Sequence, residues 1–165
     1  MKIDKLTTDE LKLLCSMLDR NQGMSEQEYN QLKIDHPYAV MREDNALILS
    51  SMKHYGKHDE ELNSFLLNKF GHKDYTIDFF YELIYNVGDY TNPHYDKKMV
   101  AQTTLVLLSD NFTGGDLIID DVNLNFNSKG DYVNFRGCDE KHAVSTVTEG
   151  QRRVLVVMFN KHTLL

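Results

Sequence analysis

His94 and Asp96 lie two positions apart in the segment NPHYDKK, with one tyrosine between them. Histidine offers a nitrogen and aspartate a hard carboxylate oxygen, and both are common ligands of divalent transition metals. Side chains two positions apart on a β-strand project to the same face. The spacing therefore allows both groups to bind one ion, provided that a third ligand comes from elsewhere in the chain.

His142 is the best-placed third ligand, because it follows the turn-rich segment GCDE and directly precedes the strand-like segment AVSTV. Two imidazoles and one carboxylate on one face of an ion leave three coordination positions open, which is typical of non-haem Fe(II) oxygenases. Such open positions would hold a cosubstrate and oxygen. His94, Asp96 and His142 are therefore the predicted metal ligands and catalytic centre.

The histidine–aspartate spacing is a weak signal by itself, because HKD at 72–74 repeats it. This second pair follows an expected helix end at Gly71 and precedes the first expected strand, so nothing fixes the direction of its side chains. Most histidines and aspartates in such loops face water. We interpret 72–74 as a solvated turn, and the neighbourhood of His94 distinguishes the two pairs.

Composition limits the class of protein. The chain has 165 residues, enough for a substantial core, and its 18 Lys and Arg against 25 Asp and Glu give a net charge of -7 that would repel nucleic acid. Cys15 and Cys138 are far apart, and no signal sequence or long apolar span is present. We expect one soluble, cytoplasmic domain over residues 1–165 with reduced thiols and no membrane or nucleic-acid partner.

Residues 1–72 are predicted to be mainly helical. TTDE at 7–10 is a helix-start signal, and leucines and methionines then recur at helical spacing as far as QG at 22–23. A shorter helix is expected to begin at Ser25, and residues 59–70 are expected to form another that ends at Gly71. Residues 45–55 are a further helix candidate.

From residue 73 the hydrophobic period becomes two, and residues 75–87 alternate as a strand. Further strands are expected at 100–108, 117–119, 122–126, 132–135, 143–147 and 153–159. A hairpin turn is expected at Asp120–Asp121. Roughly eight short strands with this spacing favour a barrel or sandwich. The predicted fold is α+β, a jelly roll over 73–165 with the N-terminal helices packed against one sheet.

Four segments follow in order over roughly residues 75–160: YNVGDYTNPHYD, GGDLII, KGDYVNFRG and KHAVSTVTEGQRRVLVVMF. Together they resemble the 2-oxoglutarate- and Fe(II)-dependent dioxygenases of the prolyl 4-hydroxylase-like type. Members of that family have a double-stranded β-helix, a distorted jelly roll, so the resemblance agrees with the strand pattern. It implies that His94, Asp96 and His142 bind Fe(II).

The same resemblance implies that Arg152, in GQR, binds the distal carboxylate of 2-oxoglutarate. Arginine suits this role because it stays charged and meets a carboxylate with two parallel hydrogen bonds. Arg152 and Arg153 would point to opposite faces of a strand, and the motif spacing selects Arg152. Tyr85 matches the tyrosine of the family's Y-x-x-G; its hydroxyl could bond the cosubstrate, or the residue could be ordinary core.

One departure concerns the second anchor of the cosubstrate. Many relatives of that type carry a tyrosine where this chain has Leu107. Thr103, Thr104 and Tyr85 are the alternatives, and the sequence does not rank them. Tyr90 could line the entrance or be a simple loop aromatic.

The resemblance implies an enzyme that uses O2 and 2-oxoglutarate to hydroxylate an unactivated C–H bond and releases succinate and CO2, with ascorbate as an optional accessory. Asp96 fills the position that related halogenases leave free for chloride. The motif order favours a peptidyl proline as substrate. A free amino acid or other small molecule is the alternative.

Two non-enzymatic functions compete with this interpretation: a cupin-like metal-binding or sensory protein, and a helical adaptor whose barrel is only a scaffold. A non-catalytic metal binder has no need for a buried cation that faces the metal, and the scaffold alternative predicts that no metal is retained. The placement of Arg152 therefore discriminates between the functions.

Overall fold

The structure, a computed structural model, describes residues 2–21, 23, 25–35, 48–49, 52–56 and 58–161. In these residues the helices are α1 (Thr8–Arg20), α2 (Glu26–Asp35) and α3 (Glu60–Phe70). The strands that precede residue 73 are β1 (Asp4–Lys5), β2 (Ile48–Leu49) and β3 (Met52–Tyr55). The later strands are β4 (Tyr75–Tyr85), β5 (Tyr90–His94), β6 (Val100–Leu107), β7 (Phe112–Gly114), β8 (Leu117–Ile119), β9 (Val122–Leu124), β10 (Asp131–Phe135), β11 (His142–Val144), β12 (Val147–Gly150) and β13 (Arg152–Lys161).

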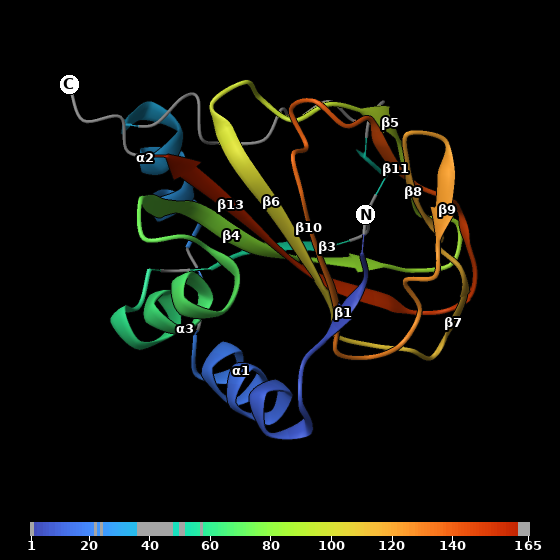
Figure 1. The fold of residues 1–165 in the computed structure, drawn as a ribbon, viewed down its shortest axis with the longest axis horizontal. Helices are drawn as coiled ribbons and strands as arrows, with labels where there is room; N and C mark the ends of the chain where they lie inside the picture. Colours follow the sequence, from blue (N-terminus) through green and yellow to red (C-terminus); the bar gives the residue numbers. More distant parts are fainter. Residues whose placement is uncertain are drawn as a thin grey trace.

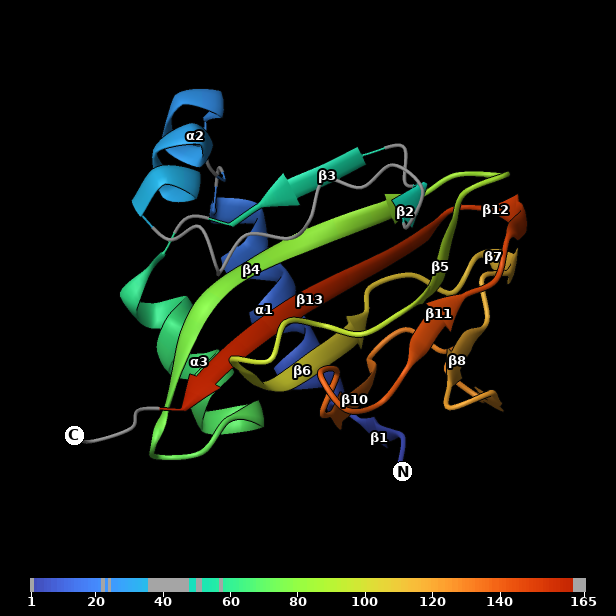
Figure 2. The ribbon, with the colours of Figure 1, turned by 90° about the horizontal axis from the view of Figure 1, so that it is seen from above.

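The strands form two main antiparallel sheets (Figures 1 and 2). The larger sheet has the order β1-β10-β6-β13-β4-β3 and the smaller sheet the order β2-β5-β11-β8-β9, while β7 and β12 form a separate pair. The chain passes repeatedly from one main sheet to the other, from β4 to β5 to β6 and again from β10 to β11 to β13. This winding is that of a double-stranded β-helix, and it confirms the predicted α+β jelly roll.

The larger sheet is buried on both faces. One face meets the smaller sheet in a cluster that includes Leu83, Leu105, Leu117, Val144, Val154 and Val156. The other face packs against α1 and α3 in a cluster that includes Leu14, Leu62, Leu66, Val106, Leu155 and Val157. Apolar residues therefore occupy both parities of β13, as strands buried on two sides require.

Helices α1 and α3 are fixed by end caps and by a contact between them. Thr7 and Glu10 form a capping box at the start of α1, and Asp59 accepts a hydrogen bond from Leu62 N at the start of α3. Lys69 Nζ lies 2.7 Å from a carboxylate oxygen of Glu10 and joins the two helices. Among the described residues, no helix combines the length and apolar character needed to cross a membrane.

The prediction of a helix at 45–55 was wrong for the part that the structure describes. Residues 48–49 and 52–55 are strands β2 and β3, while 45–47, 50 and 51 lie outside the described residues. β3 pairs with β4 from Met52↔Ile84 to Tyr55↔Tyr81. The apolar run in this segment has no decisive period, and pairing with strand edges determines its conformation: β2 pairs with β5 and β3 with β4.

The predicted strands are present; β4, β6 and β9 are shorter than predicted, β10 and β13 are longer, and β8 has the predicted bounds. Asp120 and Asp121 have φ of 49° and 64°, as a tight hairpin turn between β8 and β9 requires. The expected strand at 143–147 is divided into β11 and β12, which pair with different partners. Strands β5 and β7 were not predicted, because YTNPH and FTG lack the valines, leucines and isoleucines that mark the short strands that were predicted.

Candidate metal centre and cosubstrate pocket

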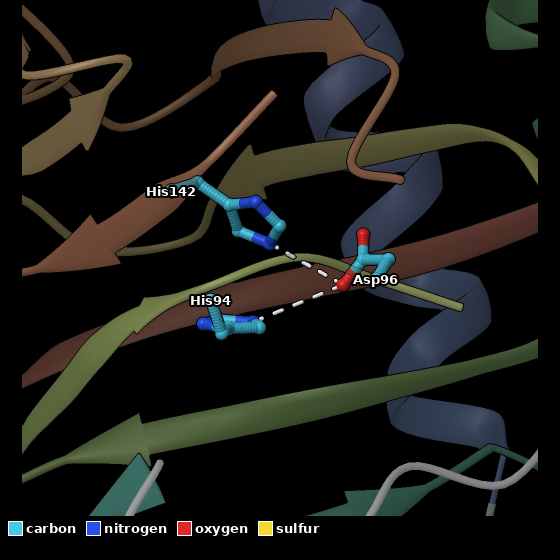
Figure 3. A group of neighbouring side chains, drawn as sticks. All are labelled: His94, Asp96 and His142. Atoms are coloured by element: carbon cyan, nitrogen blue, oxygen red, sulfur yellow. Dashed lines mark ion pairs between the residues drawn. The ribbon is translucent and has the colours of Figure 1, made fainter. Parts of the chain in front are cut away.

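His94, Asp96 and His142 converge on one point between the sheets (Figure 3). Oδ1 of Asp96 lies 3.8 Å from Nε2 of His94 and 3.3 Å from Nε2 of His142. One potential ligand atom from each residue lies within 4.8 Å of the others, and no second group of His, Cys, Asp or Glu with this spacing occurs in the described part of the chain. Two imidazole nitrogens and one carboxylate oxygen can thus face a single ion.

Different structural devices position the three residues. His94 ends β5, His142 begins β11, and the two are paired in register across these neighbouring strands. Asp96 lies beyond the end of β5, so strand alternation does not place it as the sequence analysis assumed. Its backbone N–H donates to Gly137 O at 2.8 Å. This bond holds the loop after β5 close to the two histidines.

Backbone carbonyls orient both imidazoles. Nδ1 of His94 lies 2.8 Å from Asn92 O, and Nδ1 of His142 lies 2.9 Å from Glu140 O. Because a carbonyl oxygen only accepts, each Nδ1 must carry a proton, so in the neutral form of each ring Nε2 holds the lone pair that can bind an ion. Nothing in the sequence marked Asn92 or Glu140 for this role, since any residue supplies a carbonyl.

Burial and mutual contact shift the pKa values of the three groups. Burial lowers the pKa of His94, and the nearby His142 acts in the same direction. In His142 burial also lowers the pKa, but the hydrogen bond to Asp96, the charge of Asp96 and the bond to Glu140 O together outweigh it, so the pKa lies above its ordinary value. In Asp96 burial raises the pKa, yet bonds from His142 and Thr103 outweigh it and keep the carboxylate ionised. A ligating imidazole must be neutral, so metal binding would release the proton from His142.

Arg152 lies in the same pocket and is 1% exposed. Within the residues that the structure describes, none of its three guanidinium nitrogens has a hydrogen-bond partner. Its Cζ lies 5.0 Å from the centre of the Tyr85 ring. Burial lowers the pKa of Arg152, but an arginine side chain remains charged in proteins. An unpaired buried cation is energetically unfavourable, so the pocket fits an anionic ligand such as the carboxylate of 2-oxoglutarate.

Of the two glycines of GGD, Gly115 makes room for this arginine and Gly114 for the backbone of Thr146. A Cβ on Gly115 would lie 2.8 Å from Cδ of Arg152, and one on Gly114 would lie 2.2 Å from Thr146 O. Both glycines also have left-handed φ, 62° and 73°. The connection from β7 to β8 can therefore pass close beside Arg152 only because these positions lack side chains.

The pocket around these groups is mostly apolar. Its empty volume is about 450 Å³, which includes the solvent at its open mouth. Tyr85 lines it, and its hydroxyl lies 2.7 Å from Oγ1 of Thr91. Thr91 is a lining residue that the sequence analysis missed, whereas Tyr90 is not among the lining residues. Among the described residues, the lining consists of Tyr81, Leu83, Tyr85, Thr91, His94, Asp96, Thr103, Leu105, Leu117, His142, Ala143, Val144, Arg152, Val154, Val156 and Met158.

The alternatives for a second cosubstrate anchor are placed differently. Thr103 and Tyr85 line the pocket. Thr104 instead donates to Oδ1 of Asn134 at 2.7 Å and is not a lining residue. Leu107, which replaces the tyrosine of many relatives, is buried in the core between the sheets. The second pair with metal-ligand spacing, His72 and Asp74, is exposed in the turn between α3 and β4.

No protein-family model and no curated protein matches the sequence. Solved structures do match the fold. A viral collagen prolyl hydroxylase from Paramecium bursaria Chlorella virus-1, in complex with 2-oxoglutarate, has a TM-score of 0.63 at 15% identity, covering 98% of this chain and 96% of its own. A prolyl-4-hydroxylase from Pseudomonas putida has a TM-score of 0.60 at 14% identity, covering 98% and 92%.

HygX from Streptomyces hygroscopicus, with nickel, 2-oxoglutarate and hygromycin B bound, has a TM-score of 0.61 at 10% identity. The match covers 98% of this chain and 83% of HygX. Identities this low establish common architecture only. The chain therefore has the fold of these 2-oxoglutarate-binding proteins and prolyl hydroxylases.

Proposed function

We propose that this protein is a 2-oxoglutarate- and Fe(II)-dependent oxygenase that hydroxylates an unactivated C–H bond. The observation that carries the proposal is the presence, in one pocket, of a His-Asp-His group and a buried arginine that has no hydrogen-bond partner among the described residues. A cupin-like metal binder or a scaffold barrel has no use for that cation. A dicarboxylic keto acid has two ends, and the pocket offers a partner for each.

His94, Asp96 and His142 would hold Fe(II), which together with O2 and 2-oxoglutarate supplies the oxidising power for hydroxylation, with release of succinate and CO2. The residues leave the remaining coordination positions free. Arg152 would neutralise the distal carboxylate and orient the cosubstrate through two parallel hydrogen bonds. The apolar lining would exclude water around these groups, which strengthens both contacts.

The hydroxyls of Tyr85 and Thr91 would assist Arg152. One hydrogen bond joins them at 2.7 Å and uses one of their two protons. The second proton remains available to an acceptor in the pocket, and a carboxylate bound by Arg152 is such an acceptor. This pair would replace the tyrosine that is absent at Leu107.

A peptidyl proline is the proposed substrate. The order of motifs in the sequence supports it, as does the likeness in fold to the viral and Pseudomonas putida prolyl hydroxylases. A free amino acid or other small molecule is the alternative, which the presence of hygromycin B in the HygX structure favours.

Anaerobic titration of the protein with Fe(II) and then 2-oxoglutarate tests the proposed activity. We expect a visible iron-to-keto-acid charge-transfer band in the wild type. A protein that binds Fe(II) but gives no band would be a metal-binding barrel instead. A protein that retains no metal would support the scaffold alternative. Succinate release with a panel of proline-containing peptides and free amino acids then distinguishes the substrate classes.

A further inference from the structure

The two carboxylate oxygens of Asp96 have different neighbours. Oδ1 faces His94 and His142, at 3.8 Å and 3.3 Å from their Nε2 atoms. Oδ2 instead accepts a hydrogen bond of 2.5 Å from Oγ1 of Thr103. The carboxylate is thus already divided into one oxygen directed at the ion position and one directed at the protein.

Thr103 is a rigid donor for this bond. It is 1% exposed on β6, where β10 and β13 flank it in register with Phe135 and Met158. Among the described residues, the sulfur of Met158 is the other acceptor of this hydroxyl, at 3.5 Å. A hydroxyl has one proton, and an ionised carboxylate at 2.5 Å is a far stronger acceptor than a thioether. The proton therefore belongs to the bond with Asp96.

Gly137 packs against the same carboxylate oxygen, Oδ2 of Asp96. A Cβ at this position would lie 1.8 Å from Oδ2 of Asp96 and 2.7 Å from Oγ1 of Thr103. The carbonyl of Gly137 also accepts the backbone N–H of Asp96. The carboxylate is consequently held between the strand that carries Thr103 and the loop that follows β10, with little room to rotate.

We propose that Thr103 is a positioning residue that restricts Asp96 to one-oxygen ligation, an inference that rests on the proposed function of the site. A carboxylate free to rotate can bind an ion through both oxygens and take an additional coordination position. A keto-acid cosubstrate and oxygen together need three such positions. The bond from Thr103 keeps Oδ2 away from the ion, so those positions stay open.

The test uses Co(II) alone as a probe and compares Thr103→Val, which loses the hydroxyl at nearly constant shape, with Thr103→Ser, which keeps it. Loss of a hydrogen-bond partner behind a metal ligand costs roughly 10–100-fold in affinity. We therefore expect Thr103→Val to weaken Co(II) binding within that range. Thr103→Ser should remain within about threefold of the wild type, because the donor that the bond requires is retained.

Thr104→Val is the matched control, since Thr104 is adjacent, buried and hydrogen-bonded, but to Asn134 and away from the pocket. It should leave Co(II) affinity near the wild-type value. Equal Co(II) affinity in Thr103→Val and the wild type, or equal losses in Thr103→Val and Thr104→Val, would overturn the inference.

X-ray absorption of the wild-type Co(II) protein gives a second test that needs no variant. One-oxygen ligation by the carboxylate is expected, and ligation through both oxygens would overturn the role of Thr103. A wild type that binds no Co(II) would overturn the proposed function and this inference together. A wild type that binds Co(II) while Thr103→Val is unaffected overturns this inference alone.

Discussion

Arg152 and Arg153 are neighbours in β13 that project to opposite faces of the larger sheet. Arg152 enters the pocket with its guanidinium unpaired among the described residues. Arg153, on the helix-facing side, donates from Nε to Oε1 of Glu82 at 2.6 Å. Two side chains of the same chemistry and adjacent sequence thus serve as each other's control.

Arg152→Ala should weaken 2-oxoglutarate binding by about 2 kcal/mol or more, which is over tenfold, because the distal carboxylate would be left buried without a cation. Arg152→Lys should recover part of the loss, since it keeps the charge but not the paired geometry. Titration of the charge-transfer band measures both. Arg153→Gln should bind the cosubstrate as the wild type does. Equal effects at the two positions would contradict the assignment of Arg152.

Tyr85→Phe and Thr91→Val should each weaken 2-oxoglutarate binding by roughly 2–10-fold, about the value of one net hydrogen bond. The two residues share one hydrogen bond, so the double variant should lose less than the product of the two single losses. The same titration gives the four dissociation constants needed. Strictly multiplicative losses would show that the hydroxyls act separately, and unchanged affinities would leave Tyr85 as a core residue.

Co(II) affinity should rise as the pH rises above the ordinary pKa of histidine, 6.5. The pKa of His142 is raised by its bond to Asp96, so in the metal-free protein its proton persists above pH 6.5 and competes with the ion. His94, with a lowered pKa, is already neutral there and adds no proton. Calorimetric titrations at pH 6.5 in buffers of different ionisation enthalpy should report net proton release when the ion binds. Proton uptake, or affinity that falls with rising pH, would contradict this assignment.

Leu66→Ala should lower the free energy of unfolding by about 2–5 kcal/mol, because Leu66 is fully buried between α3 and the larger sheet. Leu13→Ala is the control on α1, where the side chain is 47% exposed and its loss should cost under about 0.5 kcal/mol. Urea denaturation measures both. Co(II) affinity of folded Leu66→Ala should match the wild type, since the ion position lies across the sheet. A large loss of affinity would show that the helices support the site directly.

The sequence predicted much of this fold because its longest strands have clear patterns. Strands β4, β6 and β13 are rich in β-branched, aromatic or other apolar residues over eight or more positions. Strand β3 was not predictable, since its conformation depends on a partner edge far along the chain. Periodicity also could not choose between Arg152 and Arg153, because both faces of β13 are covered by apolar layers.

The candidate ligands were predictable from motif order, but their supports were not. The bond between Thr103 and Asp96 joins a loop to a strand of the opposite sheet, and no spacing in the sequence encodes that approach. The roles of the Asn92 and Glu140 carbonyls were likewise not predictable, since every residue type has a backbone carbonyl. Sequence identifies chemical groups well, while tertiary packing determines which of their atoms are free.

The order of strands in the larger sheet bears on how the molecule is made. β13 lies between β4 and β6, and the contact of Glu82 with Arg153 spans 71 positions of sequence. Closing so long a segment is entropically slow, so non-local pairing delays folding. A nascent polypeptide released before β13 would lack the strand that bridges its two neighbours. Chain termination before β13 should yield an aggregation-prone fragment that has no activity, not one with reduced activity.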